Sequence, residues 1–519
     1  MSDPTRTSTY GRLLVLVGLV VGAVLRVRQA LGDVSQHPDE FFQYLEPAHW
    51  HWTGEGIRAW EYIDGLRNWF MPAYHGAWMA ALDGLGIHDG GVQHRFFLVH
   101  WALAGLSAAV YARRAAPAIL RSATNVPAES AAQTFAGPLA AILVATWPAL
   151  VWWAPHVLTE LPSLFLLVIA FTKTSELLER PRAAADGPVR SRPSANWLVA
   201  VARETAGSTW REPRTGLAIG LLVGVSLVLR IPNGPVALLP LLAMFVHRRF
   251  RALATACVGL LPPIFALGLL DRLTWGDWFH SIVKYVEFNF VKGGAANFGT
   301  LPVAHYFEVL YGELGLVGCV VLPLLALVVW RRSWFWILGA LLVVSYLSTQ
   351  PHKEERFILL FWPLLLIPAA AGFGAILLAV RRRVSMQVRI VPRVVAAVAL
   401  LGLIGATFVT DQVDMQNDHM EMTCHDSFDV MDGLSYVGRQ PDALGVLSDI
   451  NWVCNGGTFR IGKNIPLDDY HAVRLSSPLY NYAVMRVETE TIDRAGFQVV
   501  ARFPRATVLR RDVPVPPLR

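Results

Sequence analysis

Acidic and imidazole side chains gather in residues 37–52, directly after an apolar run that ends at Leu25. Three carboxylates and three histidines lie there among aromatic residues, and the first carboxylates are Asp39 and Glu40. A carboxylate partly shielded from water has a raised proton affinity, which suits a general base that removes a proton from a hydroxyl group. We therefore expect Asp39 to be a catalytic base, with Glu40 as the alternative or the supporting acid. A helix cap is the competing interpretation.

The residues after Asp39 fit a helix that turns one polar face toward a ligand. Pro38 ends the preceding segment, and carboxylates in the first turn of the next helix are stabilised there. At helical spacing Asp39, Gln43 and Glu46 would share one face. We expect further substrate contacts from residues 60–67, which mix aromatic and charged side chains. The residues of this region predicted to contact substrate are His37, Gln43, Glu46, Trp60, Glu61 and Arg67.

A second cluster combines cations and acids where another apolar run begins. Its cationic or hydrogen-bond-donating side chains are His352, Lys353 and Arg356. An arginine fork matches two phosphate oxygens and a lysine is a point charge, so this cluster predicts a phosphate site. Glu354 and Glu355 would hold the cations in place, and we also expect Glu355 to contact substrate. Arg230 is a second candidate for binding the phosphate. Anchoring at the membrane surface is the competing interpretation.

The composition sets the class of protein that must position these residues. Of the 519 residues, 54% are hydrophobic and only 16% are charged, whereas a soluble domain carries about 25% charged residues. Many apolar runs approach the ~20 residues that cross a bilayer, so we predict a polytopic α-helical membrane protein. The net charge of +6 is dispersed between these runs and does not indicate nucleic-acid binding. The four cysteines include no metal or haem motif, and we predict no metal and no cofactor.

Hydropathy predicts about eleven membrane spans. Their approximate ranges are 11–31, 94–112, 132–152, 157–172, 214–230, 233–246, 252–270, 313–330, 333–349, 357–380 and 391–410. Residues 70–87 are apolar but contain His75 and Asp83, which favours an interfacial or re-entrant helix.

Arginines collect in alternate links, which predicts the orientation of the chain. Because positive charge favours the cytoplasmic side, we expect a cytoplasmic N-terminus and a cytoplasmic loop at residues 173–213. The loops at 37–92 and 271–312, the 155–160 turn and the 352–356 cluster then share the external face. Both chemical clusters would therefore lie at one membrane–water boundary.

The composition changes after about residue 410. Short alternating segments, such as residues 497–503 and 506–509, fit β-strands. We expect residues 1–410 to form the transmembrane catalytic domain and 411–519 a small external α/β domain. Cys424 and Cys454 would then lie in an oxidising compartment, where a disulfide between them and two free thiols are both open.

Three ordered motifs resemble one family. Residues 37–43 read HPDEFFQ, residues 271–278 read DRLTWGDW and residues 352–357 read HKEERF. They are similar to the loops of the Alg9-like mannosyltransferases, which are glycosyltransferase family 22 of the GT-C superfamily. Three motifs in the expected order are far more specific than an isolated acidic pair.

The resemblance implies a GT-C-type membrane enzyme that transfers mannose from a polyprenyl- or dolichyl-phosphate donor to a glycan or glycolipid acceptor. Transfer would invert the anomeric centre on the external face, without a metal, with Asp39 as base and His352, Lys353 and Arg356 at the donor phosphate. We expect membrane lipid to surround the protein. The membrane would be the plasma membrane in a prokaryote or that of the endoplasmic reticulum in a eukaryote. Another lipid-phosphate sugar and, less well supported, a lipid or glycan transporter are the alternatives. Residues 302–306 depart from the family pattern, which leaves the acceptor open.

Overall fold

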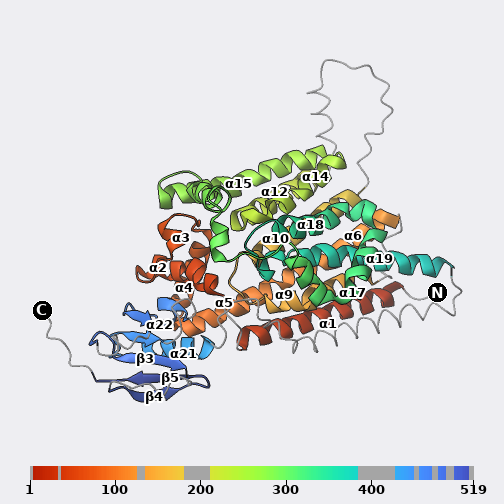
Figure 1. Cartoon of the computed structure of the whole chain (residues 1–519). Coiled ribbons are helices and arrows are strands. Elements are labelled where there is room, and N and C mark those ends of the chain that lie inside the picture. The colour runs from red at the N-terminus through yellow and green to blue at the C-terminus, as the bar shows by residue number, and fades with distance from the viewer. Residues whose placement is uncertain are drawn as a thin grey trace.

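The computed structural model describes residues 4–32, 37–124, 135–180, 211–383, 427–448, 455–469, 477–486 and 496–512. Long helices run side by side in a bundle, and α1 runs from one end of it to the other (Figure 1). A group of short helices and a β-sheet lie at the end where α1 finishes. We call this end of the bundle, where the short helices of the first predicted loop lie, the functional end.

The bundle consists of long helices and a few short ones. Its helices are α1 (Pro4–Leu31), α5 (Gly90–Ala104), α6 (Leu106–Thr124), α8 (Ala136–Thr146), α9 (Pro148–Trp152), α10 (Glu160–Glu179), α12 (Arg211–Leu229), η2 (Ile231–Asn233), α13 (Gly234–Ala237), α14 (Leu239–Val246), α15 (Phe250–Trp275), α17 (His305–Val328), α18 (Trp330–Ser348) and α19 (Phe361–Arg383). The short elements at the functional end are η1 (Glu40–Leu45), α2 (Glu46–Thr53), α3 (Trp60–Ile63), α4 (Phe70–Gly84), α16 (His280–Val286), η3 (Glu287–Val291), η4 (Gly294–Phe298) and η5 (Glu355–Ile358).

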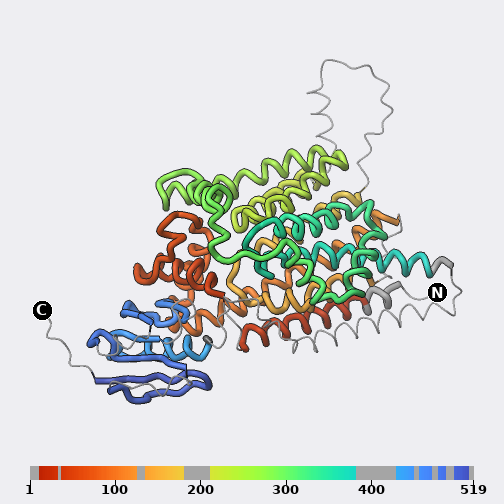
Figure 2. The backbone as a smooth tube through the Cα atoms, viewed as in Figure 1, coloured from red at the N-terminus to blue at the C-terminus, as the bar shows by residue number. Residues whose placement is uncertain are grey.

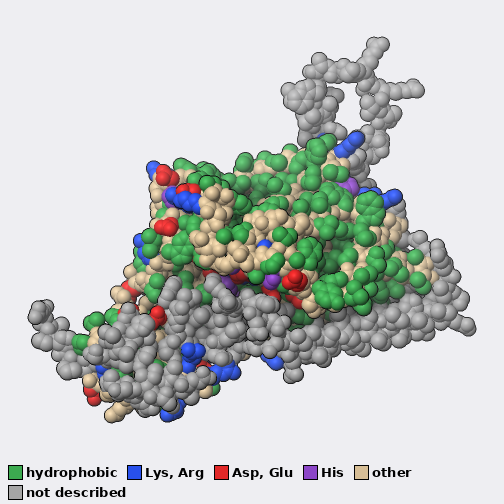
Figure 3. Space-filling view, viewed as in Figure 1, with side chains coloured by type: hydrophobic (Ala, Val, Ile, Leu, Met, Phe, Trp, Pro, Cys, Tyr) green, Lys and Arg blue, Asp and Glu red, His purple; other side chains and the backbone are tan. Residues whose placement is uncertain are grey.

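Within the described residues, seven helical segments are long and apolar enough to cross a membrane. They are Gly11–Leu31, Gly90–Thr124, Glu160–Glu179, Arg211–Leu229, Phe250–Trp275, His305–Val328 and Glu355–Val380. Hydrophobic side chains cover much of the visible face of this bundle (Figure 3), and on α17 the side chain of Val317 is 74% exposed. Such a surface is stable in lipid, so the polytopic membrane class is confirmed.

The predicted spans differ from these helices where proline interrupts a run. The span expected at 132–152 is divided into α8 and α9, because Trp147 before Pro148 has extended backbone (φ −60°, ψ 129°). The span expected at 233–246 lies on the short helices α13 and α14, and the one at 333–349 lies on α18. The span expected at 391–410 lies outside the described residues. The count of eleven stays a prediction.

Buried hydrogen bonds and small residues hold neighbouring helices of the bundle together. The side chain of Arg26 on α1 is 2% exposed and donates hydrogen bonds to the carbonyl oxygens of Val144 and Ala145, at 3.0 and 3.2 Å. These carbonyls lie at the end of α8, where the helix leaves them without intrahelical partners. On the other side, a Cβ at Gly220 of α12 would lie 1.9 Å from the carbonyl oxygen of Ala256 on α15. Glycine therefore permits the close approach of these two helices.

The C-terminal part folds as a five-stranded mixed sheet of order β2-β1-β3-β5-β4. Its strands are β1 (Val446–Ser448), β2 (Leu467–Asp469), β3 (Tyr482–Arg486), β4 (Gln498–Arg502) and β5 (Ala506–Arg510). Strand β1 pairs in parallel with β2 and β3, whereas β5 is antiparallel to β3 and β4. Helix α21 (Ser427–Gly438) packs its apolar side on this sheet, and the short helix α22 (Gly457–Ile461) faces the bundle. The strands expected near 497–503 and 506–509 are β4 and β5, while Cys424 and Cys454 lie outside the described residues.

Candidate active site

A cavity of about 480 Å³ opens at the functional end of the bundle. Its lining comes from the first loop, the start of α10, the α12–α13 turn, the α16–η4 segment and the 346–357 segment. In Figure 2 the chain that follows α15 returns beside the short helices of the first loop. There Trp60 of α3 stacks on Phe298 of η4, with 6.1 Å between the ring centroids, and both residues line the cavity. The charged and imidazole side chains that line the cavity are Asp39, Glu61, Arg67, Glu160, Arg230, His352, Glu354 and Arg356.

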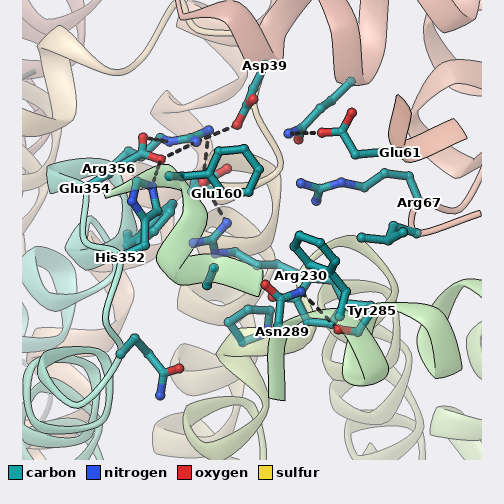
Figure 4. A pocket seen from close by; sticks show the side chains of 18 of the residues that line it. Asp39, Glu61, Arg67, Glu160, Arg230, Tyr285, Asn289, His352, Glu354 and Arg356 are labelled. Carbon is teal, nitrogen blue, oxygen red and sulfur yellow. Dashed lines mark hydrogen bonds and ion pairs between the residues drawn. The ribbon is translucent and has the colours of Figure 1, made fainter. Parts of the chain in front are cut away.

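Arg356 is the centre of one side of the cavity. Its Nη2 lies 2.6 Å from Asp39 Oδ2, and its Nε lies 2.6 Å from Glu354 Oε2. Its Nη1 lies 3.5 Å from Glu160 Oε1, the oxygen that Arg230 Nη1 approaches at 2.6 Å. We call Asp39, Glu160, Arg230, Glu354 and Arg356 the paired wall (Figure 4). Sequence positions 39 and 356 thus meet through a direct ion pair.

Two histidines bind the same carboxylate of the paired wall. His37 Nε2 lies 3.0 Å from Glu354 Oε2, and His352 Nε2 lies 2.8 Å from Glu354 Oε1. Burial alone would raise the pKa of Glu354, but Arg356 and the histidines outweigh it and hold that pKa well below its usual range. Glu354 therefore acts as an anion that orients the imidazole of His352 and the fork of Arg356.

Asp39 has one oxygen engaged and one free. Arg356 holds Oδ2, while Oδ1 accepts no hydrogen bond from any residue that the structure describes. Burial would raise the pKa of Asp39, but the charges of Arg356 and His37 lower it below its usual range. The expected raised proton affinity is therefore wrong for Asp39, because its cationic neighbours outweigh desolvation. The group is ionised at neutral pH, with Oδ1 able to accept a proton.

Arg67 extends into the cavity from the side opposite Arg356 (Figure 4). Among the described residues its guanidinium has no ion-pair or hydrogen-bond partner. Burial would lower the pKa of Arg67, but the neighbouring acidic groups Tyr44, Glu61 and Asp39 outweigh burial and raise it. Arg67 is thus a half-buried cation near carboxylates but in contact with none of those that the structure describes. An anionic ligand would fit this position.

The segment that follows α15 supports the backbone of Arg67. The indole Nε1 of Trp275 donates a hydrogen bond to the carbonyl oxygen of Arg67 at 3.2 Å. His280 stacks on Trp275 with 5.6 Å between ring centroids, and a Cβ at Gly65 would lie 2.4 Å from its Nε2. Part of the 271–278 motif therefore acts on the cavity through the turn that carries Arg67.

Gln43 and Glu61 lie beside Arg67. We call these three residues the open wall of the cavity. Gln43 Nε2 donates to Glu61 Oε1 at 3.1 Å, and the hydroxyl of Tyr62 donates to the carbonyl oxygen of Gln43 at 2.8 Å. Burial raises the pKa of Glu61, and Arg67 opposes that shift. The open wall presents one cation, one carboxyl and one amide with few internal bonds.

The structure places the predicted residues of the two clusters in three groups. Those that line the cavity are Asp39, Gln43, Trp60, Glu61, Arg67, Arg230, His352 and Arg356. His37 stands directly behind them, on Asp39 and Glu354. The predicted residues outside the described lining are Glu40, Glu46, Lys353 and Glu355.

The side chains of Glu40 and Lys353 form hydrogen bonds outside the cavity. The buried carboxylate of Glu40 accepts hydrogen bonds from His156 Nδ1 at 2.6 Å and from the backbone N–H of Val157 at 2.8 Å. Lys353 Nζ donates to the carbonyl oxygens of Leu301 and Gln350. Both groups hold the loops around the cavity together.

Glu46 departs from its expected face because residues 40–45 form a π-helix. In this segment the backbone N–H of Glu46 bonds to the carbonyl oxygen of Phe41, five residues earlier. The wider turn changes the direction of every later side chain, so Asp39 and Gln43 line the cavity while Glu46 does not. Regular helical spacing could not predict this separation.

Other lining residues had little or no sequence signal. Glu160 is the last residue of the 155–160 turn, which the charge pattern places on the same face as Asp39, but its residue type alone indicates only a helix cap. Tyr285 and Asn289 lie on α16 and the second π-helix η3. Among the residues described, no group of three or more metal-ligating side chains comes together.

The fold of this protein is similar to that of a solved membrane protein. The chain aligns over 97% of its length with 98% of the crystal structure titled ArnT from Cupriavidus metallidurans bound to undecaprenyl phosphate, with a TM-score of 0.55 and 16% identity. The fold is therefore of the GT-C type.

The family follows from sequence. The model of the Alg9-like mannosyltransferase family matches residues 18–440, and the chain belongs to this family. It is 28% identical over 358 residues to GPI mannosyltransferase 3 of Yarrowia lipolytica, covering 68% of this chain and 61% of that protein. It is 27% identical over 374 residues to alpha-1,2-mannosyltransferase alg9 of Schizosaccharomyces pombe, covering 67% and 57%. The matches thus span about three fifths of these relatives.

Proposed function

We propose that this protein is a membrane α-mannosyltransferase that uses a polyprenyl- or dolichyl-phosphate mannose donor and a hydroxyl acceptor on a glycan or glycolipid. The observation that carries the proposal is one cavity that holds a carboxylate with a free oxygen, Asp39 Oδ1, and three arginines, Arg67, Arg230 and Arg356. A base and a set of phosphate-binding cations are the two requirements of this transfer. The family and the undecaprenyl phosphate of the ArnT structure support a lipid-phosphate donor.

The reaction is a single displacement. Asp39 Oδ1 accepts the proton of the acceptor hydroxyl while the hydroxyl oxygen forms a bond to C1 of mannose. The bond between C1 and the phosphate oxygen breaks, its electron pair leaves with the phosphate, and the anomeric centre inverts. The arginines balance the charge that develops on the phosphate.

Arginine and histidine divide the task of holding the phosphate. Arg67 lacks an anionic partner within the described structure, so it meets the phosphate without first losing an ion pair. Arg230 and Arg356 exchange part of their bonding to Glu160 for the phosphate oxygens, and His352 donates from the rim. Lys353 supports the loop through backbone carbonyls instead.

The transfer takes place on the external face, with the N-terminus in the cytoplasm. The arginine pattern of the links supports this orientation. Cysteine labelling tests it in a variant whose four native cysteines are replaced by serine. Ala296→Cys, at the cavity end, is labelled only from outside, and Arg331→Cys only from the cytoplasm. The reverse pattern would invert the site.

A membrane assay tests the function. Membranes containing the wild-type protein or Asp39→Asn receive polyprenyl-phosphate carriers charged with radiolabelled mannose, glucose or a pentose, and transfer to endogenous glycolipids is measured. We expect transfer from the mannosyl carrier with the wild type alone. Transfer of a different sugar would replace mannose in the proposal, and transfer of none would reject a glycosyltransferase and favour a transporter.

A further inference from the structure

Glu46 is a fully buried carboxylate that joins three segments of the chain outside the cavity. Its Oε1 accepts a hydrogen bond from the backbone N–H of Phe459 at 2.6 Å. Its Oε2 accepts bonds from the hydroxyl of Thr458 at 2.6 Å and from the backbone N–H of Ile57 at 3.1 Å. Burial raises the pKa of Glu46, and the bonds from these three donors oppose that shift. A buried polar group needs such partners, and two of the three belong to the C-terminal sheet domain.

Glycines shape this contact on both sides of the carboxylate. Gly457 has φ +65°, and a Cβ there would lie 2.1 Å from Glu46 Oε1. Gly456 also has a positive φ of +82°, and a Cβ at Gly56 would lie 3.2 Å from Glu46 Oε2. The Asn455 side chain accepts a bond from the N–H of Gly457 at 2.9 Å and fixes the turn. Residues 455–459 are therefore built around the carboxylate of Glu46, and they contact both of its oxygen atoms.

The position of Glu46 affects the open wall through two short connections. Its backbone N–H closes the π-helix η1, which carries Gln43. Its carboxylate also holds Ile57, three residues before Trp60. Gln43 and Glu61 are then joined directly at 3.1 Å. A shift of the carboxylate would move both of these cavity residues.

Other contacts dock the domain independently of Glu46. Asp432 of α21 pairs with Arg95 of α5 at 3.1 Å, Arg460 of α22 lies with its Nη1 3.0 Å from His94 Nδ1 of α5, and Arg439 pairs with Asp89. Loss of the Glu46 bonds would therefore leave the domain in place. The family model ends at residue 440, so residues 455–459 lie beyond it.

We propose that residues 455–459 of the C-terminal domain position the open wall for the transfer reaction by holding the carboxylate of Glu46. This inference rests on the proposed function, because the open wall is where substrate binds. Glu46, Gly457 and Thr458 are positioning residues and do not touch substrate. The C-terminal domain thus contributes to turnover from outside the cavity.

The test compares Gly457→Ala with Gly496→Ala in the full-length protein. Both glycines have positive φ, but nothing lies within 4 Å of a Cβ at Gly496, so this control reproduces the backbone strain without the clash. We expect Gly457→Ala to lower kcat for mannose transfer roughly 10–100-fold, since a displacement of about 1 Å costs that much. Binding of undecaprenyl phosphate, measured by tryptophan fluorescence, changes less than about twofold, because Glu46 reaches Gln43 and Glu61 while the backbone of Arg67 is held separately by Trp275 and the paired wall is untouched. Equal kcat in the two variants, or an equal loss of phosphate binding and kcat in Gly457→Ala, would overturn the proposal.

A second variant and a second measurement keep the test decisive. If Gly457→Ala does not fold, Thr458→Val removes one hydrogen bond without added bulk, and kcat falls roughly three- to tenfold. Hydrogen exchange of residues 55–62 rises in either variant and stays at the wild-type level in Gly496→Ala. Because exchange needs no substrate, an unchanged exchange pattern defeats the positioning role alone. A wild type without transfer activity defeats only the proposed function.

Discussion

The two walls of the cavity compensate their charges in different ways. On the paired wall, Arg356 contacts three carboxylates and Arg230 contacts one of them, so every cation has an anion within 4 Å. On the open wall, Arg67 is half-buried and has no such contact among the described residues. Removing a cation from water without a partner is costly, whereas paired charges offset that cost. We therefore propose that the open wall binds an anion, whereas the ion pairs of the paired wall orient the carboxylate of Asp39.

The largest effect should come from the base of the paired wall. Asp39→Asn keeps the shape of the side chain but cannot take a proton, and loss of a general base costs about 10²–10⁴ in rate. No helix cap is lost, because the side chain of Asp39 makes no cap hydrogen bond to η1. We expect folded protein that binds undecaprenyl phosphate and hardly turns over, measured as kcat for mannose transfer. Normal turnover in Asp39→Asn beside an inactive Glu40→Gln would move the base by one residue.

The next effect would separate the walls as phosphate sites. Arg67→Gln should weaken undecaprenyl phosphate binding and lower kcat/KM for the donor, because a lost charge contact costs about 2–4 kcal/mol of transition-state stabilisation. Arg67→Lys keeps the charge without the fork and should recover part of the loss. His352→Ala, on the other side, should weaken donor use less. If Arg67→Gln binds phosphate normally, the open wall serves the acceptor instead.

A smaller effect concerns the pH profile. The pKa of Asp39 is lower in the folded protein than its ordinary value, because Arg356 and His37 outweigh burial. Its ionisation therefore stabilises the fold above the ordinary carboxyl pKa, and this contribution is lost as pH falls through the folded pKa. In Arg356→Gln, burial and Glu354 raise the pKa, so the acid limb of kcat/KM in the residual activity moves to higher pH. The limb stays in place in the control His352→Ala; a fixed limb in both would remove Asp39 as the titrating base.

The smallest effect tests the support of the open wall. Trp275→Phe removes the N–H that bonds to the carbonyl oxygen of Arg67 and keeps an aromatic ring against His280. A neutral hydrogen bond contributes about 0.5–1.5 kcal/mol, so KM for the donor should rise roughly two- to tenfold. Trp278→Phe is the control, since its ring is 46% exposed on the same turn. Equal effects of the two substitutions would show that this segment acts only as a membrane anchor.

Much of the site could be predicted from residue type and position along the chain. Asp39, His352 and Arg356 stand in ordered motifs at the ends of apolar runs, and their chemistry suits a base and a phosphate site without any coordinates. Hydropathy also predicted a polytopic helical protein, because burial of long apolar runs depends on composition more than on exact packing. The same reasoning failed for Glu46, since a π-turn changes direction without a residue pattern that marks it.

By itself, the sequence determined the membrane class, the family motifs and the order in which base and cations occur. Only the tertiary structure decided which charges meet. Arg356 and Arg67 are the same residue type in similar loops, yet one has three carboxylates within 4 Å and the other has none in the described structure. The physical reason is distance: ion pairing and pKa depend on separations of a few ångströms between segments hundreds of residues apart, and residue spacing along the chain carries no such information.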